Sequence, residues 1–376
     1  MKYRIAILGS YGGMNLGDEA ILQVILRQIR ECLDAEVLVL SRNAEDTQRR
    51  HKVRAINVRD SEKDQIINEL KSMDLFILGG GGILFDGMAQ EMLRHVKFAK
   101  ELGIPIMVYA ISVGPLQDPE AKKLVSEVLN RVDLISVREN EARRLLIELG
   151  VTQHIELTAD PALLMQEEPL TDDIIAKKGF DPALPIVGFS VREPGKAAPD
   201  LDVDHYHAVL ANAADFMIER FKAEILFIPM EPGERRDMQH SHAIISKMSN
   251  TKKADVLKGE YSSGQILSLV KHFSFAVGMR LHFLIFCALQ NVPFVPLPYA
   301  AKVSGFISDL GLGIESISDL NVGKLCAYLD RAWDSRPAIK KKLAENVPPL
   351  QQKARRTNQI LCEFLRAVKP ESHRVT

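Results

Sequence analysis

The residues best suited to chemistry lie in the segment 278–282, where Arg280 and His282 stand two positions apart. The apolar residues 273–277 before them predict a buried strand, and the apolar residues 283–289 predict a buried helix. Arg280 and His282 would therefore lie at the carboxyl end of a strand, where open α/β sheets bind ligands. A guanidinium beside a helix start favours a phosphate or carboxylate. The structural alternative is that Arg280 pairs with a carboxylate and His282 is a core histidine.

Two further arginines each follow a predicted strand. Arg138 has Glu139 and Glu141 close by in the sequence, which favours an ion pair. Arg192 leads instead into a loop rich in proline and glycine, and it is the better candidate for a ligand cleft. Because two guanidinium groups can hold two anionic groups at once, Arg192 and Arg280 together would suit a doubly anionic ligand.

A glycine-rich segment, residues 9–20, follows the first predicted strand and opens the first predicted helix. It matches neither the GxGxxG pattern nor a Walker loop. Glycines such as Gly13 would let the backbone approach a ligand closely, and Asn15 could form a hydrogen bond to it. For Asp18 and Glu19 the structural alternative is helix capping and compensation of the helix dipole.

A second glycine-rich segment comprises four consecutive glycines, residues 79–82, directly after the predicted strand 75–78. Four glycines lose much conformational entropy on ordering, and their apolar neighbours argue against a surface linker. We therefore expect a tight turn at the carboxyl end of a strand. Its backbone N–H groups would face an anion or a sugar hydroxyl.

Two pairs of histidines, His205 with His207 and His240 with His242, resemble metal ligands in their spacing. No cysteine accompanies them and no HExxH pattern is present, so a solvated face is the preferred interpretation. We predict no metal and no cofactor. The sequence also contains no GxSxG motif of a covalent hydrolase.

Composition and charge narrow the function classes. The chain has 376 residues, 48 Lys plus Arg and 49 Asp plus Glu, without a long single-sign block, so a nucleic-acid partner is not expected. The start lacks the features of a signal peptide and no apolar run could span a bilayer, which predicts a cytoplasmic chain. The four cysteines are far apart, and we expect them to be reduced and buried. They are Cys32, Cys287, Cys326 and Cys362.

Strand and helix patterns alternate along most of the chain, which predicts parallel sheets covered on both faces. Between residues 165 and 185 the pattern gives way to polar residues and helix breakers, which indicates a domain boundary. We therefore predict two doubly wound domains, residues 1–168 and 182–336, facing a central cleft, and a helical tail, residues 337–376.

Taken together, an ordered set of segments resembles the polysaccharide pyruvyl transferase family. Each segment alone is weak, but their order along nearly the whole chain is specific. The segments are 12–20, 75–86, 111–116, 130–139, 159–161, 188–192, 278–288 and 298–303.

The resemblance implies a fold of two Rossmann-like halves similar to GT-B glycosyltransferases. It also implies transfer of a pyruvyl group from phosphoenolpyruvate to a sugar as a ketal, with release of phosphate. It places the donor at Arg192, Arg280, Leu281 and His282, and the acceptor side at Gly13, Asn15, Asp18, Gly80, Gly81 and Gly82.

The implied chemistry suits these residue types. Phosphoenolpyruvate carries a carboxylate and a phosphate, which two arginines and a helix start can orient. An imidazole can give or take a proton near neutral pH, so His282 is assigned as general acid or base. The resemblance allows lipid-linked sugar precursors as acceptors, which a cytoplasmic chain would meet at the membrane surface. Two alternatives are a nucleotide-sugar glycosyltransferase and a noncatalytic protein that binds a glycan or metabolite.

Overall fold

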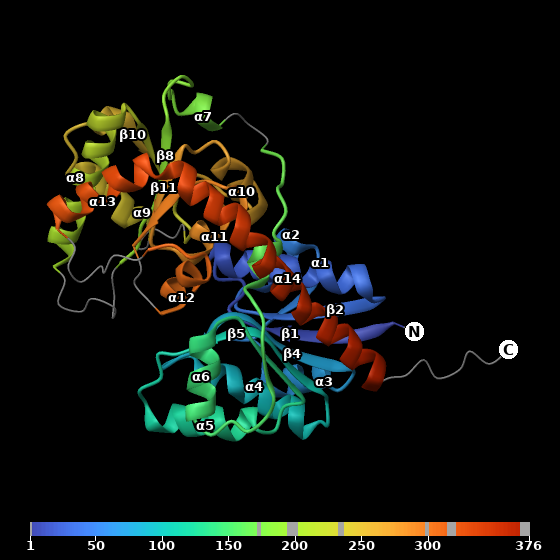
Figure 1. Cartoon of the computed structure of the whole chain (residues 1–376). Coiled ribbons are helices and arrows are strands. Elements are labelled where there is room, and N and C mark those ends of the chain that lie inside the picture. Colours follow the sequence, from blue (N-terminus) through green and yellow to red (C-terminus); the bar gives the residue numbers. More distant parts are fainter. Residues whose placement is uncertain are drawn as a thin grey trace. The chain divides into compact units, whose positions relative to one another are not determined.

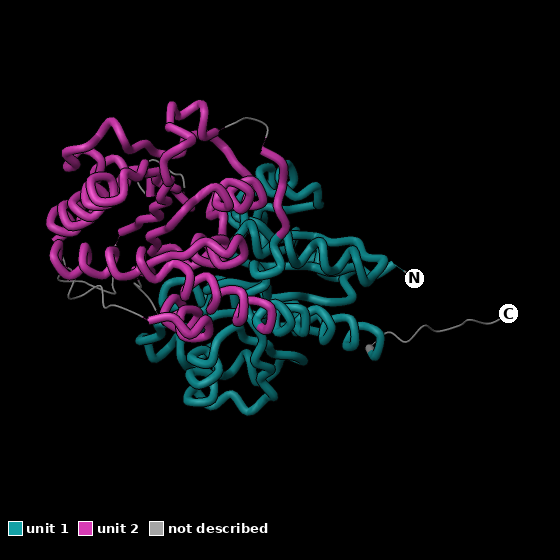
Figure 2. Tube along the Cα trace, turned by 45° about the horizontal axis from the view of Figure 1, so that its top comes forward, with its two compact units in different colours: residues 1–13, 18–165, 350–376 teal, residues 14–17, 166–349 magenta. Residues whose placement is uncertain are grey.

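The computed structural model describes residues 2–170, 174–193, 202–231, 237–297, 301–313 and 321–368. The chain forms two compact units, coloured separately in Figure 2. Unit 1 comprises Met1–Gly13, Asp18–Met165 and Leu350–Thr376, and unit 2 comprises Met14–Gly17 and Gln166–Pro349.

In the described residues of unit 1, seven parallel strands form a sheet in the order β3-β2-β1-β4-β5-β6-β7 (Figure 1). Figure 1 shows α1 on one face of this sheet and α4 and α5 on the other. All eight residues of β5 are buried, as expected for a strand covered on both faces. The strands are β1 Tyr3–Leu8, β2 Ala35–Ser41, β3 Arg54–Asn57, β4 Leu75–Leu84, β5 Ile106–Val113, β6 Leu134–Val137 and β7 Ile155–Leu157. The α-helices that alternate with them are α1 Leu16–Cys32, α2 Ala44–His51, α3 Lys63–Leu70, α4 Ala89–Glu101, α5 Pro119–Leu129 and α6 Asn140–Glu148.

In unit 2, five parallel strands form a second sheet in the order β10-β9-β8-β11-β12 (Figure 1). Side chains of α8, α9 and α13 share one core with these strands. The strands are β8 Ile186–Ser190, β9 Glu224–Phe227, β10 Ala254–Val256, β11 Phe275–Gly278 and β12 Phe294–Pro296. The remaining helices are α7 Ile174–Lys177, α8 Val203–Phe221, α9 Asp237–Ser246, α10 Ser263–Val270, α11 Leu281–Leu289, α12 Ala301–Asp309, α13 Val322–Asp334 and α14 Arg336–Val368. The predicted fold class, two α/β domains with parallel sheets, is confirmed.

The division into units differs from the predicted boundaries in two places. Met14–Gly17 belongs to unit 2 because Leu16 N–H donates to Met230 O at 2.8 Å and Ser263 Oγ donates to Leu16 O at 2.6 Å. The predicted tail, residues 337–376, does not form a part of its own, because its described residues continue α14 and are divided between the units after Pro349.

The prediction of a tight turn at residues 79–82 is wrong. All four glycines lie inside β4, where Gly79 pairs with Tyr109 of β5 and Gly82 pairs with Ser112. A Cβ atom at Gly79 would lie 2.6 Å from Tyr11 Oη. The close packing of neighbouring side chains on this strand, rather than a turn, therefore accounts for the glycines there.

The prediction of four reduced cysteines is also wrong for one pair. Cys32 at the end of α1 and Cys362 on α14 form a disulfide across 330 positions of sequence, both within unit 1. The sequence could not indicate this pairing, because it depends on α14 returning to α1. Cys287 is buried and free, as expected, and the free Cys326 is half-buried.

None of the helices in the described ranges combines the length and apolar character that crossing a bilayer requires.

Candidate functional site

The strand order of unit 2 reverses between β8 and β11, which lie side by side in the sheet (Figure 1). Gly278 at the end of β11 pairs with Ser190 at the end of β8, and Met279 N–H donates to Ser190 O at 2.8 Å. Arg192 and Arg280 each follow these paired residues by two positions. The two arginines predicted to act together are thus on adjacent strand ends, at the switch point where open sheets bind ligands.

The helix α11 begins immediately after this strand end. Arg280 is its N-cap residue, Leu281 is buried and His282 is half-buried in the first turn. A Cβ atom at Gly278 would lie 2.9 Å from Phe283 Cδ1, so glycine permits the helix to start this close to the strand. The predicted succession of buried strand, polar residues and buried helix is confirmed.

Arg280 makes a buried ion-pair network. Its Nε donates to Asp237 Oδ2 at 2.9 Å, its Nη2 also donates to Asp237, and Nη2 donates to Glu231 Oε2 at 2.7 Å. The backbone N–H groups of Met230 and Glu231 donate to the same Asp237 carboxylate. Burial raises the pKa of Asp237 above its usual range, and the charge of Arg280 opposes that rise. The structural alternative for Arg280, pairing with carboxylates, is therefore realised in the described residues.

His282 is contacted by the amino-terminal segment of unit 2. A Cβ atom at Gly17 would collide with the His282 imidazole, so Gly17 allows the backbone to lie directly against the ring. Asn15 Oδ1 accepts a hydrogen bond from Gly17 N–H at 2.9 Å, which fixes the amide of Asn15 close to this contact. The sequence placed Asn15 on the acceptor side, and the structure places it near a predicted donor residue.

Arg192 is half-buried, and its Nε donates to the carbonyl of Glu193 at 3.2 Å. The buried Tyr206 of α8 anchors the backbone here, because its hydroxyl donates to Arg192 O at 3.1 Å and also contacts Met279 Sδ. Tyr206 thereby ties the end of β8 to the residue before Arg280. Most of the predicted loop after Arg192, residues 194–201, lies outside the described residues.

The histidine pairs are arranged differently from the prediction. His205 and His242 are exposed, as expected, but His207 is buried and its Nε2 lies 2.8 Å from His240 Nδ1. The solvated-face interpretation is wrong for His207, because α8 and α9 pack with that side chain between them. Burial lowers the pKa of both His207 and His240. Within the part of the chain that the structure describes, no three His, Cys, Asp or Glu side chains are grouped to hold a metal ion.

The predicted acceptor residues that belong to unit 1 lie around the end of β1 and along β4. A Cβ atom at Gly81 would lie 3.3 Å from Asp18 Oδ1, and Gly13 lies against the Arg42 guanidinium. Glu19 lies in the first turn of α1, and its Oε1 accepts from Gly12 N–H at 2.9 Å, which lies outside the helix, so this bond is structural without being the helix cap considered above. Its Oε2 lies 2.7 Å from a ring nitrogen of His51. The Glu19 carboxylate thus connects the segment before α1 to the end of α2.

Arg138 makes the predicted ion pair with Glu139, with Nε donating to Oε2 at 3.1 Å. The sequence did not reveal its second partner, Asp160, whose Oδ2 accepts from Nη1 at 2.6 Å. Burial raises the pKa of Glu139, and Arg138 opposes that rise. All three side chains are at least nine-tenths buried, so they form a closed structural cluster.

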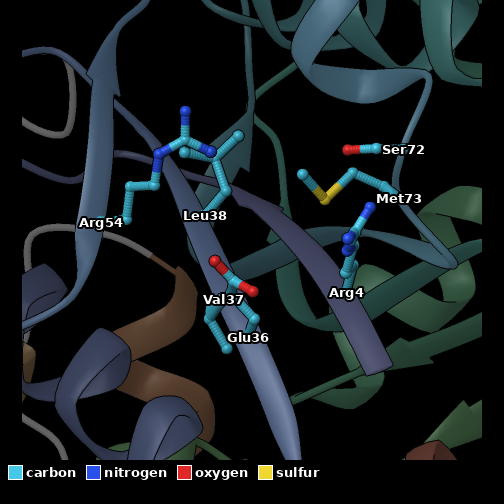
Figure 3. Close-up of a pocket in the computed structure, with 7 residues that line it drawn as sticks. All are labelled: Arg4, Glu36, Val37, Leu38, Arg54, Ser72 and Met73. Atoms are coloured by element: carbon cyan, nitrogen blue, oxygen red, sulfur yellow. The ribbon is translucent and has the colours of Figure 1, made fainter. Parts of the chain in front are cut away.

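A pocket of 240 Å³ lies at the amino-terminal ends of strands in the unit 1 sheet (Figure 3). Its lining includes Arg4, Glu36 and Arg54, which belong to the first residues of β1, β2 and β3. Arg54 is paired with Glu69 at 2.5 Å. Since ligands of open α/β sheets bind at carboxyl ends of strands, this pocket is not the candidate site.

Comparisons with known proteins confirm the family that the sequence resembles. A family profile described as polysaccharide pyruvyl transferase matches residues 15–300. The amylovoran biosynthesis protein AmsJ of Erwinia amylovora is 22% identical over 315 residues, which cover 81% of this chain and 75% of that protein. The matched range includes residues 298–300, which lie outside the described residues.

Solved structures with the same fold include MnaA from S. aureus in a co-structure with UDP. It has a TM-score of 0.70 at 11% identity, covering 98% of this chain and 99% of that chain. A glycosyltransferase from Rickettsia africae ESF-5 has a TM-score of 0.64 at 12% identity, covering 99% of this chain and 100% of that chain. At such identities the likeness concerns the fold alone, which is GT-B-like as predicted.

Proposed function

Because the chain belongs to the polysaccharide pyruvyl transferase family, we propose that it transfers a pyruvyl group from phosphoenolpyruvate to a sugar of a polysaccharide or glycan precursor. The product is a pyruvate ketal and phosphate is released. The observation that carries this proposal is the position of Arg192, Arg280 and His282 on two adjacent strand ends at the switch point of the unit 2 sheet.

Arg280 supports the proposal only if one of its partners gives way to the donor. Asp237 is a permanent partner, because its side chain is 1% exposed and two backbone N–H groups also hold it. Glu231 is the replaceable partner, since its side chain is 16% exposed and therefore within reach of a ligand from solvent. The donor's anionic group would take the place of Glu231, and Arg192 would hold the second anionic group.

The proton balance of ketal formation gives His282 its role. Two hydroxyl groups of the acceptor form C–O bonds to C2 of the donor, while the bond from C2 to the phosphate oxygen breaks. Of the two hydroxyl protons, one ends on the methylene carbon and the other leaves with phosphate. An imidazole at the start of α11 is able to carry one of these protons.

The acceptor is proposed to be a sugar, lipid-linked precursors included. Asn15 offers a hydrogen-bonding side chain next to the Gly17–His282 contact, and both residues lie in unit 2. The other proposed acceptor residues are Gly13, Asp18, Gly80, Gly81 and Gly82 of unit 1. No cofactor enters this reaction.

The direct experiment incubates the purified chain with phosphoenolpyruvate and glycan acceptors, and follows phosphate release together with the mass of the glycan. We expect phosphate release that depends on the acceptor and a product that gains a pyruvyl ketal. His282→Ala is expected to abolish turnover, and full turnover by this variant would remove the proposed role of His282. Phosphate release without a change in glycan mass would contradict transfer.

A second candidate, a nucleotide-sugar glycosyltransferase, is favoured by the fold shared with a solved glycosyltransferase. A thermal-shift panel separates the two functions, because a ligand that binds the native state raises the melting temperature. Stabilisation by phosphoenolpyruvate but not by nucleotide sugars supports the pyruvyl transferase. Specific stabilisation by a nucleotide sugar supports the alternative, and binding of a glycan without turnover of either donor supports a noncatalytic protein.

A further inference from the structure

Two histidines that are far apart in sequence meet beside the candidate donor residues. His207 comes from α8 and His240 from α9, and the 2.8 Å separation of His207 Nε2 and His240 Nδ1 is a hydrogen bond between the rings. Their ring centroids lie 5.1 Å apart.

The helix α9 places His240 next to Arg280 through Asp237. Asp237 is the first residue of α9 and holds the Arg280 guanidinium, and His240 follows one helical turn later on the same face. The charged groups that act on His240 are Glu193, Asp237, Arg192 and Arg280. His240 is thus within electrostatic reach of both arginines proposed to hold the donor.

The contact between the rings determines which nitrogen of His240 can serve a ligand. Nδ1 of His240 is occupied by His207, so only Nε2 remains for an external group. If His207 donates its Nε2–H, neutral His240 must carry its own proton on Nε2. In that tautomer the Nε2–H group of His240 can donate a hydrogen bond to an anion.

We propose that His240 is a further donor-site residue whose Nε2–H donates to the phosphate of the donor, and that His207 is the positioning residue that fixes this tautomer. This inference rests on the proposed function for the identity of the donor. It adds a third anion-binding side chain to Arg192 and Arg280.

A neutral donor suits this position better than another cation. Burial lowers the pKa of His240, and Arg192 and Arg280 oppose the effect of Glu193 and Asp237, which favour its charged form. A neutral imidazole N–H can bind phosphate without adding to the repulsion between two guanidinium groups. Around His207, Asp204 favours and Lys247 disfavours the protonated form, so no strong local charge opposes the neutral pair.

The test uses variants that separate the two nitrogens of His240. His240→Asn keeps a polar atom near the position of Nδ1 for His207 and removes Nε2. Because a hydrogen bond to a charged group contributes about 1.5–3 kcal/mol, we expect the dissociation constant of phosphoenolpyruvate to rise about 10-fold to 100-fold. His242→Asn, an exposed position on the same helix, is the matched control and should bind as the wild type does.

His207 is tested by rescue. His207→Leu removes the donor to His240 Nδ1 and should weaken phosphoenolpyruvate binding and flatten the pH profile of KM. His207→Gln retains an amide N–H near the position of Nε2 and should restore most of the affinity. Equal affinity in the Leu and Gln variants would show that His207 only fills space, and would overturn its positioning role.

Binding of inorganic phosphate, measured by calorimetry and by NMR of the imidazole nitrogens, distinguishes failure of this inference from failure of the proposed function. If phosphate binds in a manner that depends on His240 but phosphoenolpyruvate is not turned over, the anion site stands and the proposed reaction fails. If phosphoenolpyruvate is turned over and His240→Asn binds it as the wild type does, this inference fails alone. If the wild type binds neither anion, both fail.

Discussion

The two sheets reverse their strand order in the same way but end in different chemistry. In unit 1 the reversal lies between β1 and β4, and β4 contains the four consecutive glycines, residues 79–82. In unit 2 it lies between β8 and β11, which are followed by Arg192, Arg280 and His282. One topology therefore places a run of glycines at the reversal in unit 1, and two arginines and a histidine just after the reversal in unit 2.

The difference extends to how each unit treats a buried arginine. Arg138 of unit 1 is enclosed by Asp160 and Glu139, which are 6% and 8% exposed. Arg280 of unit 2 has one enclosed partner, Asp237, and one partly exposed partner, Glu231. A buried ion pair with a replaceable partner can accept a ligand anion, whereas a fully enclosed one is structural. This contrast supports the proposal that the donor binds in unit 2.

The largest expected effect comes from removing each arginine in turn. Arg138→Met and Arg280→Met should each lower the free energy of unfolding by about 3–5 kcal/mol, because each leaves buried carboxylates without a cation. Binding of phosphoenolpyruvate, measured by calorimetry below the melting temperature, should be lost only in Arg280→Met.

Paired substitutions control for instability in this comparison. Adding Asp160→Asn to Arg138→Met, or Asp237→Asn to Arg280→Met, removes an unpaired charge and should recover part of the stability. The recovered Arg280 variant should still fail to bind. Loss of binding in the recovered Arg138 variant would place donor chemistry in unit 1 and refute the contrast.

The second expected effect concerns the disulfide between Cys32 and Cys362 in unit 1. Replacing Cys362 by Ser should lower the free energy of unfolding by about 2–4 kcal/mol, because the disulfide to Cys32 restricts the unfolded chain. Denaturant unfolding with and without a reductant measures this effect. Cys326→Ser in unit 2 is the control and should respond to the reductant as the wild type does. Four titratable thiols in protein prepared without reductant would contradict the disulfide.

The central strands and the donor segment could be predicted from sequence because their signals are local. Continuous apolar runs indicated β5 and β11, and the polar residues between β11 and α11 marked a strand end. Two short edge strands gave no such signal: β7 and β10 have three residues each, interrupted by Glu156 and Asp255, and neither was predicted. A run of three residues has too little periodicity to be distinguished from a loop.

The partners of the site residues could not be predicted, because they depend on contacts distant in sequence. Asp237 lies 43 positions from Arg280, and His240 lies 33 positions from His207. The sequence analysis grouped the four histidines by their positions in the sequence, His205 with His207 and His240 with His242. The fold instead joins one member of each pair, since α8 and α9 pack against each other.

The third expected effect contrasts two glycines. In unit 1, Gly80→Ala would place a Cβ atom against the Ile21 side chain. Because overpacking of this kind strains the core, the substitution should lower the free energy of unfolding by about 1–3 kcal/mol. In unit 2, Gly17→Ala would displace the His282 imidazole and should reduce kcat more than stability. Unfolding in urea and steady-state turnover measure the two effects.

Gly313→Ala is the matched control for these substitutions, because no atom of the described residues lies within 4 Å of a Cβ there and the backbone needs no left-handed conformation. It should change neither stability nor turnover appreciably. A Gly17→Ala variant with wild-type turnover would show that the position of the imidazole does not limit the reaction. A Gly80→Ala variant as stable as the Gly313→Ala variant would show that β4 tolerates a side chain.

The smallest expected effect is on the pH dependence of stability, and it also separates the units. Burial lowers the pKa of His95 in unit 1 and of His207 and His240 in unit 2. Below the unfolded pKa of about 6.5, the unfolded chain therefore binds more protons than the folded chain. Stability is present in full above this pH and is lost as the pH falls toward the folded values.

Unfolding free energies at about pH 7.5 and about pH 5.5 measure this loss. Replacing His207 and His240 together by Leu should reduce the loss on acidification more than His95→Leu does, because it removes two imidazoles of lowered pKa instead of one. The exposed His242→Asn variant should retain the full loss. If the His95 variant had the larger effect, the buried titrating groups of unit 1 would dominate. The contrast between the enclosed Arg138 cluster of unit 1 and the ionisable side chains of unit 2 would then not extend to proton binding.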